Sequence, residues 1–277
     1  MIEGWRYYNH ALLPITAPFK PIDDQIFSKK GFWSVRNGIA VMAQYISDYD
    51  CQEETQWWCC VKDTPYNFER IKAKRRYVIN KGRKNFRVAN IDVRDYLDEL
   101  IDVEIKALEN YPEEYRPDTD IKTIKEKFKD VEKSKLMVMG AFNSEKKLCG
   151  YLTVHEYDDY CNFAQQKVIP EYEKQEINAA LVDGMLQYYN DRIKDGYVIY
   201  DGQRNLIHQT NFQEYLVKYF EFRYAYCRLR IQYRFPLGLA IKILYPFKGK
   251  MENTKNRFLY KVGGVLRMEE IRRKCME

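Results

Sequence analysis

The residues best suited to catalysis follow a short apolar segment, GYVIY, at residues 196–200. Asp201 comes directly after it, and Arg204 and His208 follow shortly. A carboxylate or an imidazole can accept a proton, and a guanidinium can bind an anion. Because ligand sites in sheets flanked by helices form where strands end, we predict that these three side chains line a pocket. The alternative is a plain turn, since Asp-Gly favours turns on its own.

Other polar side chains extend this candidate site. His155 stands at the end of another apolar segment, LCGYLTVHE, and is a second candidate base. Its alternative is a partly exposed strand residue with no chemical role. Gln209 and Asn211 lie beside His208 and are candidate substrate-binding residues. No metal site is predicted, because the chain has only 3 His and its 7 Cys include no Cys-x-x-Cys pair.

A basic stretch, RIKAKRRYVINKGRKNFR, occupies residues 70–87 and holds nine Lys or Arg with no carboxylate. Apolar residues near helical spacing predict a helix here, with Gly82 as a candidate C-cap. The remaining faces are basic and could meet a tRNA or a phosphate-bearing substrate. A solvated helix that packs one face on the core is the alternative. The candidate substrate-binding residues of this helix are Lys74, Arg75, Arg76 and Lys81.

The formal net charge of +6 conceals a strong asymmetry along the chain. Residues 1–69 sum to −3, residues 88–222 to −10 and residues 223–277 to +10. Two basic regions therefore flank an acidic middle, which indicates a polarised surface and a bound anion. The 45% hydrophobic and 31% charged residues are typical of an ordinary globular chain.

The cysteines and the termini bear on location. Scattered cysteines without a pairing pattern are typical of reduced thiols in a cytoplasmic protein. The segment MIEGWRYYNHALLP lacks the apolar core of an export signal, and no run of 18 apolar residues occurs. We therefore expect a cytoplasmic protein without a transmembrane segment.

Hydrophobic periodicity predicts an α/β (α+β) fold with a mixed central sheet flanked by helices. Alternation on both sides of Asn37-Gly38 predicts an N-terminal β-hairpin over residues 32–50, with a third strand at 55–63. From residue 86 the expected order is strand, helix, helix, three strands, helix, strand, helix, strand. This order suggests a β-rich extension at 1–69, a main domain at 70–235 and an amphipathic C-terminal segment at 236–277.

The same order and two sequence segments resemble the GNAT acyltransferase superfamily. The segment KRRYVINKGRKNFRV is similar to the "R-Y-x-I-x-K" helix that precedes the GNAT domain in the bacterial FemAB-like branch, the peptidoglycan-bridge aminoacyltransferases. The matching positions are Arg76, Tyr77, Ile79 and Lys81. A later helix end, Tyr219–Phe222, resembles a family motif in which glycine is expected where Glu221 stands. The resemblance covers about residues 55–235 and implies a partial first GNAT-like lobe before residue 70.

The resemblance implies an enzyme that moves an activated acyl or aminoacyl group to an acceptor amine, for example on a cell-envelope or sugar precursor. GNAT acetyltransferases bind the pyrophosphate of coenzyme A on a glycine-rich loop that opens a helix. Here the corresponding VIPEYEKQEINAALVDG has no glycine before Gly184 and begins with three carboxylates. These carboxylates argue against acetyl-CoA bound in the usual mode, whereas FemAB-like members, which take aminoacyl-tRNA, also lack that loop. The candidate donors are aminoacyl-tRNA and acetyl-CoA. Two alternatives are a non-catalytic GNAT module that binds RNA or another polyanion, and an acetyl-CoA-dependent N-acetyltransferase.

An apolar segment near the C-terminus, FPLGLAIKILYPFKGK at residues 235–250, is too short to span a bilayer. It predicts either contact with a membrane surface near lipid-linked substrates or a helix packed on the core. The sequence predicts neither the acceptor nor the oligomeric state.

Overall fold

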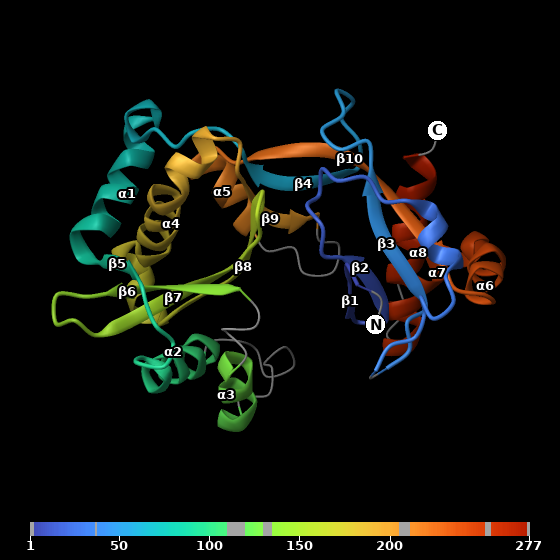
Figure 1. The fold of residues 1–277 in the computed structure, drawn as a ribbon, viewed down its shortest axis with the longest axis horizontal. Coiled ribbons are helices and arrows are strands. Elements are labelled where there is room, and N and C mark those ends of the chain that lie inside the picture. Colours follow the sequence, from blue (N-terminus) through green and yellow to red (C-terminus); the bar gives the residue numbers. More distant parts are fainter. Residues whose placement is uncertain are drawn as a thin grey trace. The chain divides into compact units, whose positions relative to one another are not determined.

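The computed structural model describes residues 3–36, 38–109, 120–129, 135–204, 211–252 and 256–275, and Figure 1 shows its elements. The chain forms two compact units. Unit 1 comprises residues 1–59, 203–210 and 224–277, and unit 2 comprises residues 60–202 and 211–223.

Unit 1 is a mixed sheet with helices near the C-terminus. Its strand order is β1-β2-β3-β10-β4, in which β2 and β3 are parallel while β1 and β2, and β3 and β10, are antiparallel. The strands are β1 (Trp5–Tyr8), β2 (Ala11–Pro14), β3 (Met42–Ser47), β4 (Trp57–Lys62) and β10 (Arg223–Tyr233). The helices are η1 (Asp24–Ser28), α6 (Leu237–Leu244), η5 (Tyr245–Phe247), α7 (Lys248–Glu252) and α8 (Arg257–Lys274).

The N-terminal hairpin exists, but it joins β1 to β2 and does not lie at the predicted residues. No strand forms within residues 32–36, although β3 forms from the second half of the predicted hairpin. Phe32 is 1% exposed, and its ring meets the rings of Trp5 and Phe27 edge-on at 5.1 and 5.3 Å. Aromatic packing of an irregular segment thus produced an alternation that resembles a strand. Asn37 lies outside the described residues.

Unit 2 contains the predicted order of elements from residue 86 onward, which is confirmed up to β10. Its strand order is β9-β8-β7-β6-β5, with β8 and β9 parallel and the other neighbours antiparallel. The strands are β5 (Arg87–Asn90), β6 (Leu136–Phe142), β7 (Leu148–Glu156), β8 (Tyr160–Val168) and β9 (Val198–Gln203), which ends at the boundary of the unit. The helices are η2 (Phe68–Arg70), α1 (Ala73–Asn85), α2 (Leu97–Leu108), α3 (Ile121–Lys129), η4 (Pro170–Gln175), α4 (Ile177–Lys194) and α5 (Phe212–Phe220).

Helices cover both faces of this second sheet. Figure 1 shows α2 and α3 on one face and α4, with α1 beside it, on the other. A core cluster joins α2 and α3 to β6 and β7 through Leu100, Phe128, Val138 and Tyr151. The central helix α4 is largely buried, as expected of a helix between a sheet and a second helix.

The basic helix α1 docks on α4 through a glycine and an ion pair. A Cβ atom on Gly82 would lie 2.6 Å from the carbonyl oxygen of Glu176, so only glycine fits this approach. Arg83 donates two hydrogen bonds of 2.7 Å to the carboxylate of Asp183, which is 2% exposed. Gly82 is therefore a packing residue, and the prediction that it ends the helix was wrong, since α1 continues to Asn85.

Candidate functional site

The parallel strands β8 and β9 of unit 2 pair over only part of their length. Three residue pairs join the two parallel strands, the last being Asn162 with Tyr200. Both strands continue beyond this pair, β8 to Val168 and β9 through Asp201 and Gly202. Because the backbone groups of the unpaired stretch do not bond to the neighbouring strand, this is the part of the sheet that can accept a ligand.

A β-bulge in β8 falls at the same place. Val154 of β7 faces Phe163, but Thr153 faces Gln165, so Ala164 is an additional residue. A bulge of this kind bends the strand and changes the direction of the side chains that follow. Gln165 and Gln166, directly after the bulge, therefore point to opposite sides of the sheet.

Asp201 is the first residue of β9 after the paired stretch. Burial raises the pKa of its carboxyl to about 8, and the side chain of Gln213 on α5 forms a hydrogen bond with it. A carboxyl with a pKa near neutral pH can accept a proton from a substrate and return it. The predicted candidate base thus lies at the strand divergence, although its burial was not foreseen from the sequence.

Two buried polar atoms near the start of α4 have no hydrogen-bond partner in the part of the chain that the structure describes. They are Oε1 of Gln166 and the hydroxyl of Tyr215. The Gln166 amide donates to Oδ1 of Asn178, in the first turn of α4, at 2.6 Å. Burial raises the pKa of Tyr215, and nearby Glu176 raises it further. Because unpaired buried polar groups are costly, these two atoms are suited to bind a polar ligand.

Aromatic rings pack around Tyr215. The ring of Phe212 lies 5.5 Å from that of Phe163 on β8 and 6.0 Å from that of Tyr215. Phe220 meets Tyr215 edge-on at 5.7 Å. These rings place an apolar surface next to an unpartnered hydroxyl, a combination that is typical of small-molecule sites.

A buried carboxylate lies on the face of the sheet covered by α2. Glu104 is 5% exposed and accepts hydrogen bonds from the hydroxyl of Tyr151 and, at 3.4 Å, from the amide of Gln165. The Glu104 carboxylate thus fixes the side chain of Gln165, the first residue after the bulge. Sequence reasoning missed Glu104, Gln165, Gln166, Asn178 and Tyr215. The one available signal was the polar AQQK run at the end of a predicted buried strand.

His155 is placed apart from Asp201. It pairs with Asn162 of β8, which in turn pairs with Tyr200 of β9, so these three residues form one row across the sheet. Side chains in one row share a face, and the next residue along a strand points to the other face. Asp201 therefore lies on the face opposite His155, and the two do not form a pair.

The remaining predicted site residues are distributed among different elements. Arg204 belongs to unit 1, where its guanidinium donates to the carbonyl of Gln56 at 2.6 Å and lies over the Trp58 ring at 4.7 Å. Asn211 is exposed at the start of α5. His208 and Gln209 lie outside the described residues, so their roles stay predictions.

The basic residues of α1 differ in their surroundings. Lys74 is exposed, and Arg75 and Arg76 are intermediate in exposure. Arg76 donates to the carboxylate of Glu69 at 2.7 Å. Lys81 donates to the carbonyl of Lys174 in η4, also at 2.7 Å. Lys81 is thus engaged within unit 2, whereas the first turns of α1 present cationic side chains to solvent.

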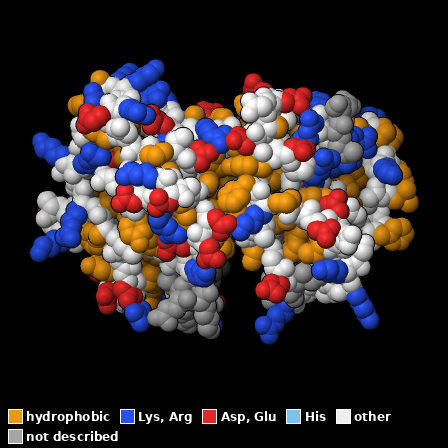
Figure 2. Space-filling model, turned by 45° about the horizontal axis from the view of Figure 1, so that its top comes forward, with side chains coloured by type: hydrophobic (Ala, Val, Ile, Leu, Met, Phe, Trp, Pro, Cys, Tyr) orange, Lys and Arg blue, Asp and Glu red, His pale blue; other side chains and the backbone are white. Residues whose placement is uncertain are grey.

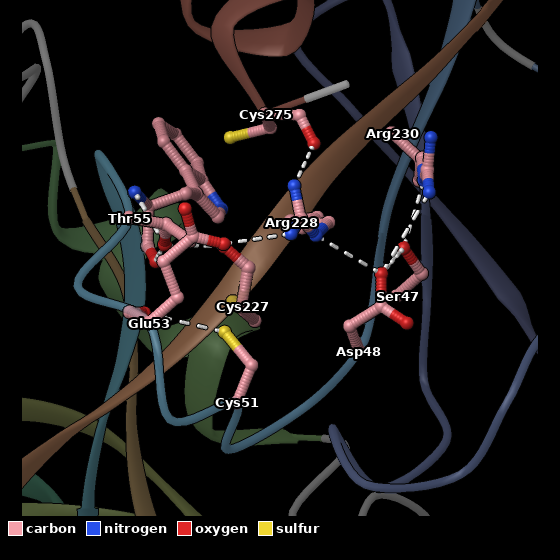
Figure 3. Close-up of polar contacts among 10 residues, drawn as sticks. Ser47, Asp48, Cys51, Glu53, Thr55, Cys227, Arg228, Arg230 and Cys275 are labelled. Carbon is pink, nitrogen blue, oxygen red and sulfur yellow. Dashed lines mark hydrogen bonds and ion pairs between the residues drawn. The ribbon is translucent and has the colours of Figure 1, made fainter. Parts of the chain in front are cut away.

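Two arginines of β10, Arg228 and Arg230, are paired within unit 1, as Figure 3 shows. Arg228 donates to the Glu53 carboxylate at 2.8 Å and to the carbonyl of Cys275, and its Nε lies 3.4 Å from the Asp48 carboxylate. Arg230 donates to the hydroxyl of Ser47 at 2.8 Å. The polar face of this strand therefore connects loops of the same unit.

Comparison with known proteins gives the class of fold. No family model and no curated protein matches the chain. The structure of L-PGS from Bacillus licheniformis is 12% identical with a TM-score of 0.50, and the match covers 87% of this chain and 83% of that one. The C-terminal domain (DUF2156) of a protein named as a lysylphosphatidylglycerol synthetase, from Agrobacterium fabrum, is 10% identical with a TM-score of 0.50, covering 87% and 84%.

A third match is PaiA N-acetyltransferase from Thermoplasma acidophilum in complex with coenzyme A, at 19% identity and a TM-score of 0.31, over 39% of this chain and 73% of that one. At these identities the likeness extends to the fold and not to the reaction. The predicted mixed α/β fold with a central sheet flanked by helices is confirmed, and the two structures that match at a TM-score of 0.50 share it.

The start of α4, where GNAT acetyltransferases bind pyrophosphate, does not fit that group here. Glu171 and Glu173 precede the helix, and Glu176 at its N-cap adopts a left-handed conformation with φ of 68°. Carbonyl oxygens of this segment accept hydrogen bonds from Lys81 and Asn85 of α1. Three carboxylates repel a pyrophosphate, and Gly82 of α1 packs directly against Glu176. Coenzyme A bound in the usual way is therefore disfavoured.

Proposed function

We propose that the chain is an acyl- or aminoacyltransferase of the FemAB-like type, in which an acceptor amine attacks an activated acyl ester directly. The observation that carries this proposal is the position of Asp201 directly after the last pair of β8 with β9, where desolvation raises the pKa of its carboxyl to about 8. The GNAT-like fold makes that divergence the natural place for an acyl group.

In the proposed reaction Asp201 removes a proton from the acceptor amine as the nitrogen attacks the acyl carbon. A nitrogen–carbon bond forms and the ester carbon–oxygen bond breaks. The proton held by Asp201 then passes to the leaving oxygen, so the carboxylate is regenerated. The Tyr215 hydroxyl is buried and without a described partner, so it is available to donate to the acyl oxygen.

The proposed donor is an aminoacyl ester, such as a charged tRNA. Two observations support this choice over acetyl-CoA. The segment before α4 carries carboxylates that repel a pyrophosphate, and one of its carbonyl oxygens already accepts a hydrogen bond from Lys81 of α1. The protein named as a lysylphosphatidylglycerol synthetase, which matches at a TM-score of 0.50, is named for an aminoacylated product. The proposed acceptor is an amine, for example on a cell-envelope or sugar precursor.

Thermal unfolding with candidate donors tests the proposal. A ligand that binds only the native state raises the midpoint of unfolding, by an amount that grows with its concentration. We expect a rise with charged tRNA and none with acetyl-CoA. Transfer of the amino acid to an amine should then be lost in Asp201→Asn. A rise with acetyl-CoA, together with acetyl transfer, would establish the N-acetyltransferase alternative instead.

A second candidate function rests on the exposed side of α1. Tyr77 is 69% exposed beside Lys74, and no carboxylate occurs within residues 70–87. Exposed cations with an aromatic side chain are typical of surfaces that bind RNA. A non-catalytic module would bind RNA with a steep salt dependence and would transfer no acyl group to any amine.

A further inference from the structure

The helical segment after β10 presents an apolar stripe to solvent. Phe235, Leu239, Ile243 and Phe247 are 86%, 58%, 61% and 51% exposed. Leu239 and Ile243 lie four residues apart on α6 and so differ by only about 40° around its axis, while Phe235 directly precedes this helix and Phe247 ends the short turn η5 that follows it. Large apolar side chains gathered in this way indicate an interaction surface rather than a random exposure.

The opposite side of the same helix is fixed to unit 1. Ile241 is 3% exposed. Tyr245 lies under the guanidinium of Arg273 at 3.8 Å, and Lys248 forms an ion pair of 2.7 Å with Glu270, both partners being on α8. The stripe is thus held outward by packing beneath it, and the prediction that this segment packs on the core holds for one face only. Figure 2 shows hydrophobic side chains at the right-hand edge, where α6 lies in Figure 1.

The basic residues around the stripe indicate which kind of partner it binds. Residues 234–250 contain Arg234, Lys242, Lys248 and Lys250 and no Asp or Glu. Lys242 and Lys250 are exposed and lie on the stripe side of the helix or at its edge. An apolar face edged by cations complements a membrane surface with anionic lipid headgroups. A symmetric contact with a second copy would instead bring these lysines together without a carboxylate between them.

The length of the stripe determines how it meets a bilayer. The helical part, Leu237–Phe247, has 11 residues and rises about 16 Å at the α-helical spacing, well short of the roughly 30 Å hydrocarbon core. Among the described helices, none has the length and apolar character needed to cross a membrane. We propose that α6 and η5 lie flat on an anionic membrane surface, inserting Phe235, Leu239, Ile243 and Phe247 between the lipids. This proposal does not depend on the transfer reaction.

Co-sedimentation of the full chain with lipid vesicles tests the proposal. Vesicles of phosphatidylcholine alone are compared with vesicles that also contain phosphatidylserine, which supplies negative charge. We expect binding to the anionic vesicles and at least a tenfold loss of binding in Leu239→Ser/Ile243→Ser. Lys242→Gln and Lys250→Gln should each reduce binding to anionic vesicles about fivefold. Ile121→Ser, a change at a 49% exposed isoleucine on α3, is the matched control and should bind like the unchanged chain.

Three results would overturn the proposal. They are no binding to anionic vesicles, equal binding by Leu239→Ser/Ile243→Ser, and a concentration-dependent dimer in sedimentation velocity that this double substitution abolishes. Circular dichroism checks that each variant is folded. Asp201→Asn should bind vesicles normally, so a failure of the proposed transfer reaction and a failure of membrane binding are distinguishable.

Discussion

The ammonium of Lys62 lies 3.7 Å from the carboxylate of Glu221 and 3.4 Å from the carbonyl oxygen of the same residue. Lys62 is fully buried, and that burial lowers its pKa. Glu221 ends α5 in the left-handed region, with φ of 58°, where glycine is the usual residue. The glutamate thus replaces an expected glycine and supplies a partner for a buried cation.

This relationship predicts that two substitutions at position 221 destabilise the protein by different amounts. Glu221→Ala removes the carboxylate but keeps a Cβ at positive φ, so we expect the free energy of unfolding to fall by about 2 kcal/mol. Glu221→Gly also removes the carboxylate but relieves about 1 kcal/mol of backbone strain, so it should be the milder change. Urea denaturation of both variants measures the difference. An equal loss in both would show that the backbone conformation carries no cost.

The raised pKa of Asp201 predicts a pH profile for the proposed reaction. The base must be ionised to accept a proton, so kcat/KM should rise with pH and level off above about pH 8. Asp201→Asn should lower kcat by at least a hundredfold, in line with the loss of a general base. Steady-state kinetics from pH 5 to 9 test this (about the range in which a carboxyl of this kind titrates). A profile flat over that range would exclude Asp201 as the base.

The same pKa predicts how stability changes with pH. Between pH 4 and 8 the unfolded chain has lost the Asp201 proton while the folded chain retains it, so this residue makes stability fall as pH rises. Asp201→Asn removes that penalty and should raise the free energy of unfolding at pH 7 by roughly 1–3 kcal/mol. At pH 4 the variant and the unchanged chain should be nearly equal. A loss of stability at pH 7 would contradict a protonated Asp201.

The contact of Gly82 with α4 predicts a strong effect of a small change. The Cβ of Gly82→Ala would meet the Glu176 oxygen at 2.6 Å and the Ala180 nitrogen at 3.0 Å, both of them backbone atoms. We expect a loss of about 1–3 kcal/mol in the free energy of unfolding. Gly264→Ala, in helix α8 with no atom within 4 Å of the new Cβ, is the control and should stabilise by about 0.5–1 kcal/mol. Thermal denaturation compares the two.

The first turns of α1 predict a salt-dependent affinity for polyanions. Replacing Lys74, Arg75 and Arg76 with Gln removes three charges without touching the buried Ile79 or Gly82. Affinity for tRNA should fall, and the slope of log affinity against log salt should decrease by about 2–3. Filter binding at several salt concentrations measures both quantities. Unchanged affinity would leave α1 with a structural role only.

Periodicity predicted most elements of unit 2 because each buries a wide apolar face. The stripe of Leu100, Ile101 and Leu108, for example, is buried as expected for α2. Periodicity failed at Phe32, where packing of aromatic rings imitates strand alternation, and at Gly82, where a close approach of two helices resembles a helix stop. Both failures depend on residues distant in the sequence.

The candidate site was only partly predictable for a similar reason. Asp201 could be singled out because polar residues directly after a buried strand lie at a sheet end. The bulge at Ala164 depends on the register of β8 against β7, which no local pattern specifies. The buried oxygen atoms of Gln166 and Tyr215 are unpaired because no described residue of the fold places a hydrogen-bond partner beside them. Such features arise when distant segments of the chain pack together, so the spacing of residues along the sequence does not predict them.

Unit 1 is built from both ends of the chain, whereas most of unit 2 comes from the single segment 60–202. Arg228 illustrates this, because it joins Asp48 and Glu53 to Cys275. During synthesis on the ribosome the 60–202 segment is complete while unit 1 still lacks residues 224–275. Domains generally fold as units once their residues are available. The aromatic cluster of Trp5 and Phe32 draws only on N-terminal residues, whereas β3 can pair with β10 only after that later strand has been made.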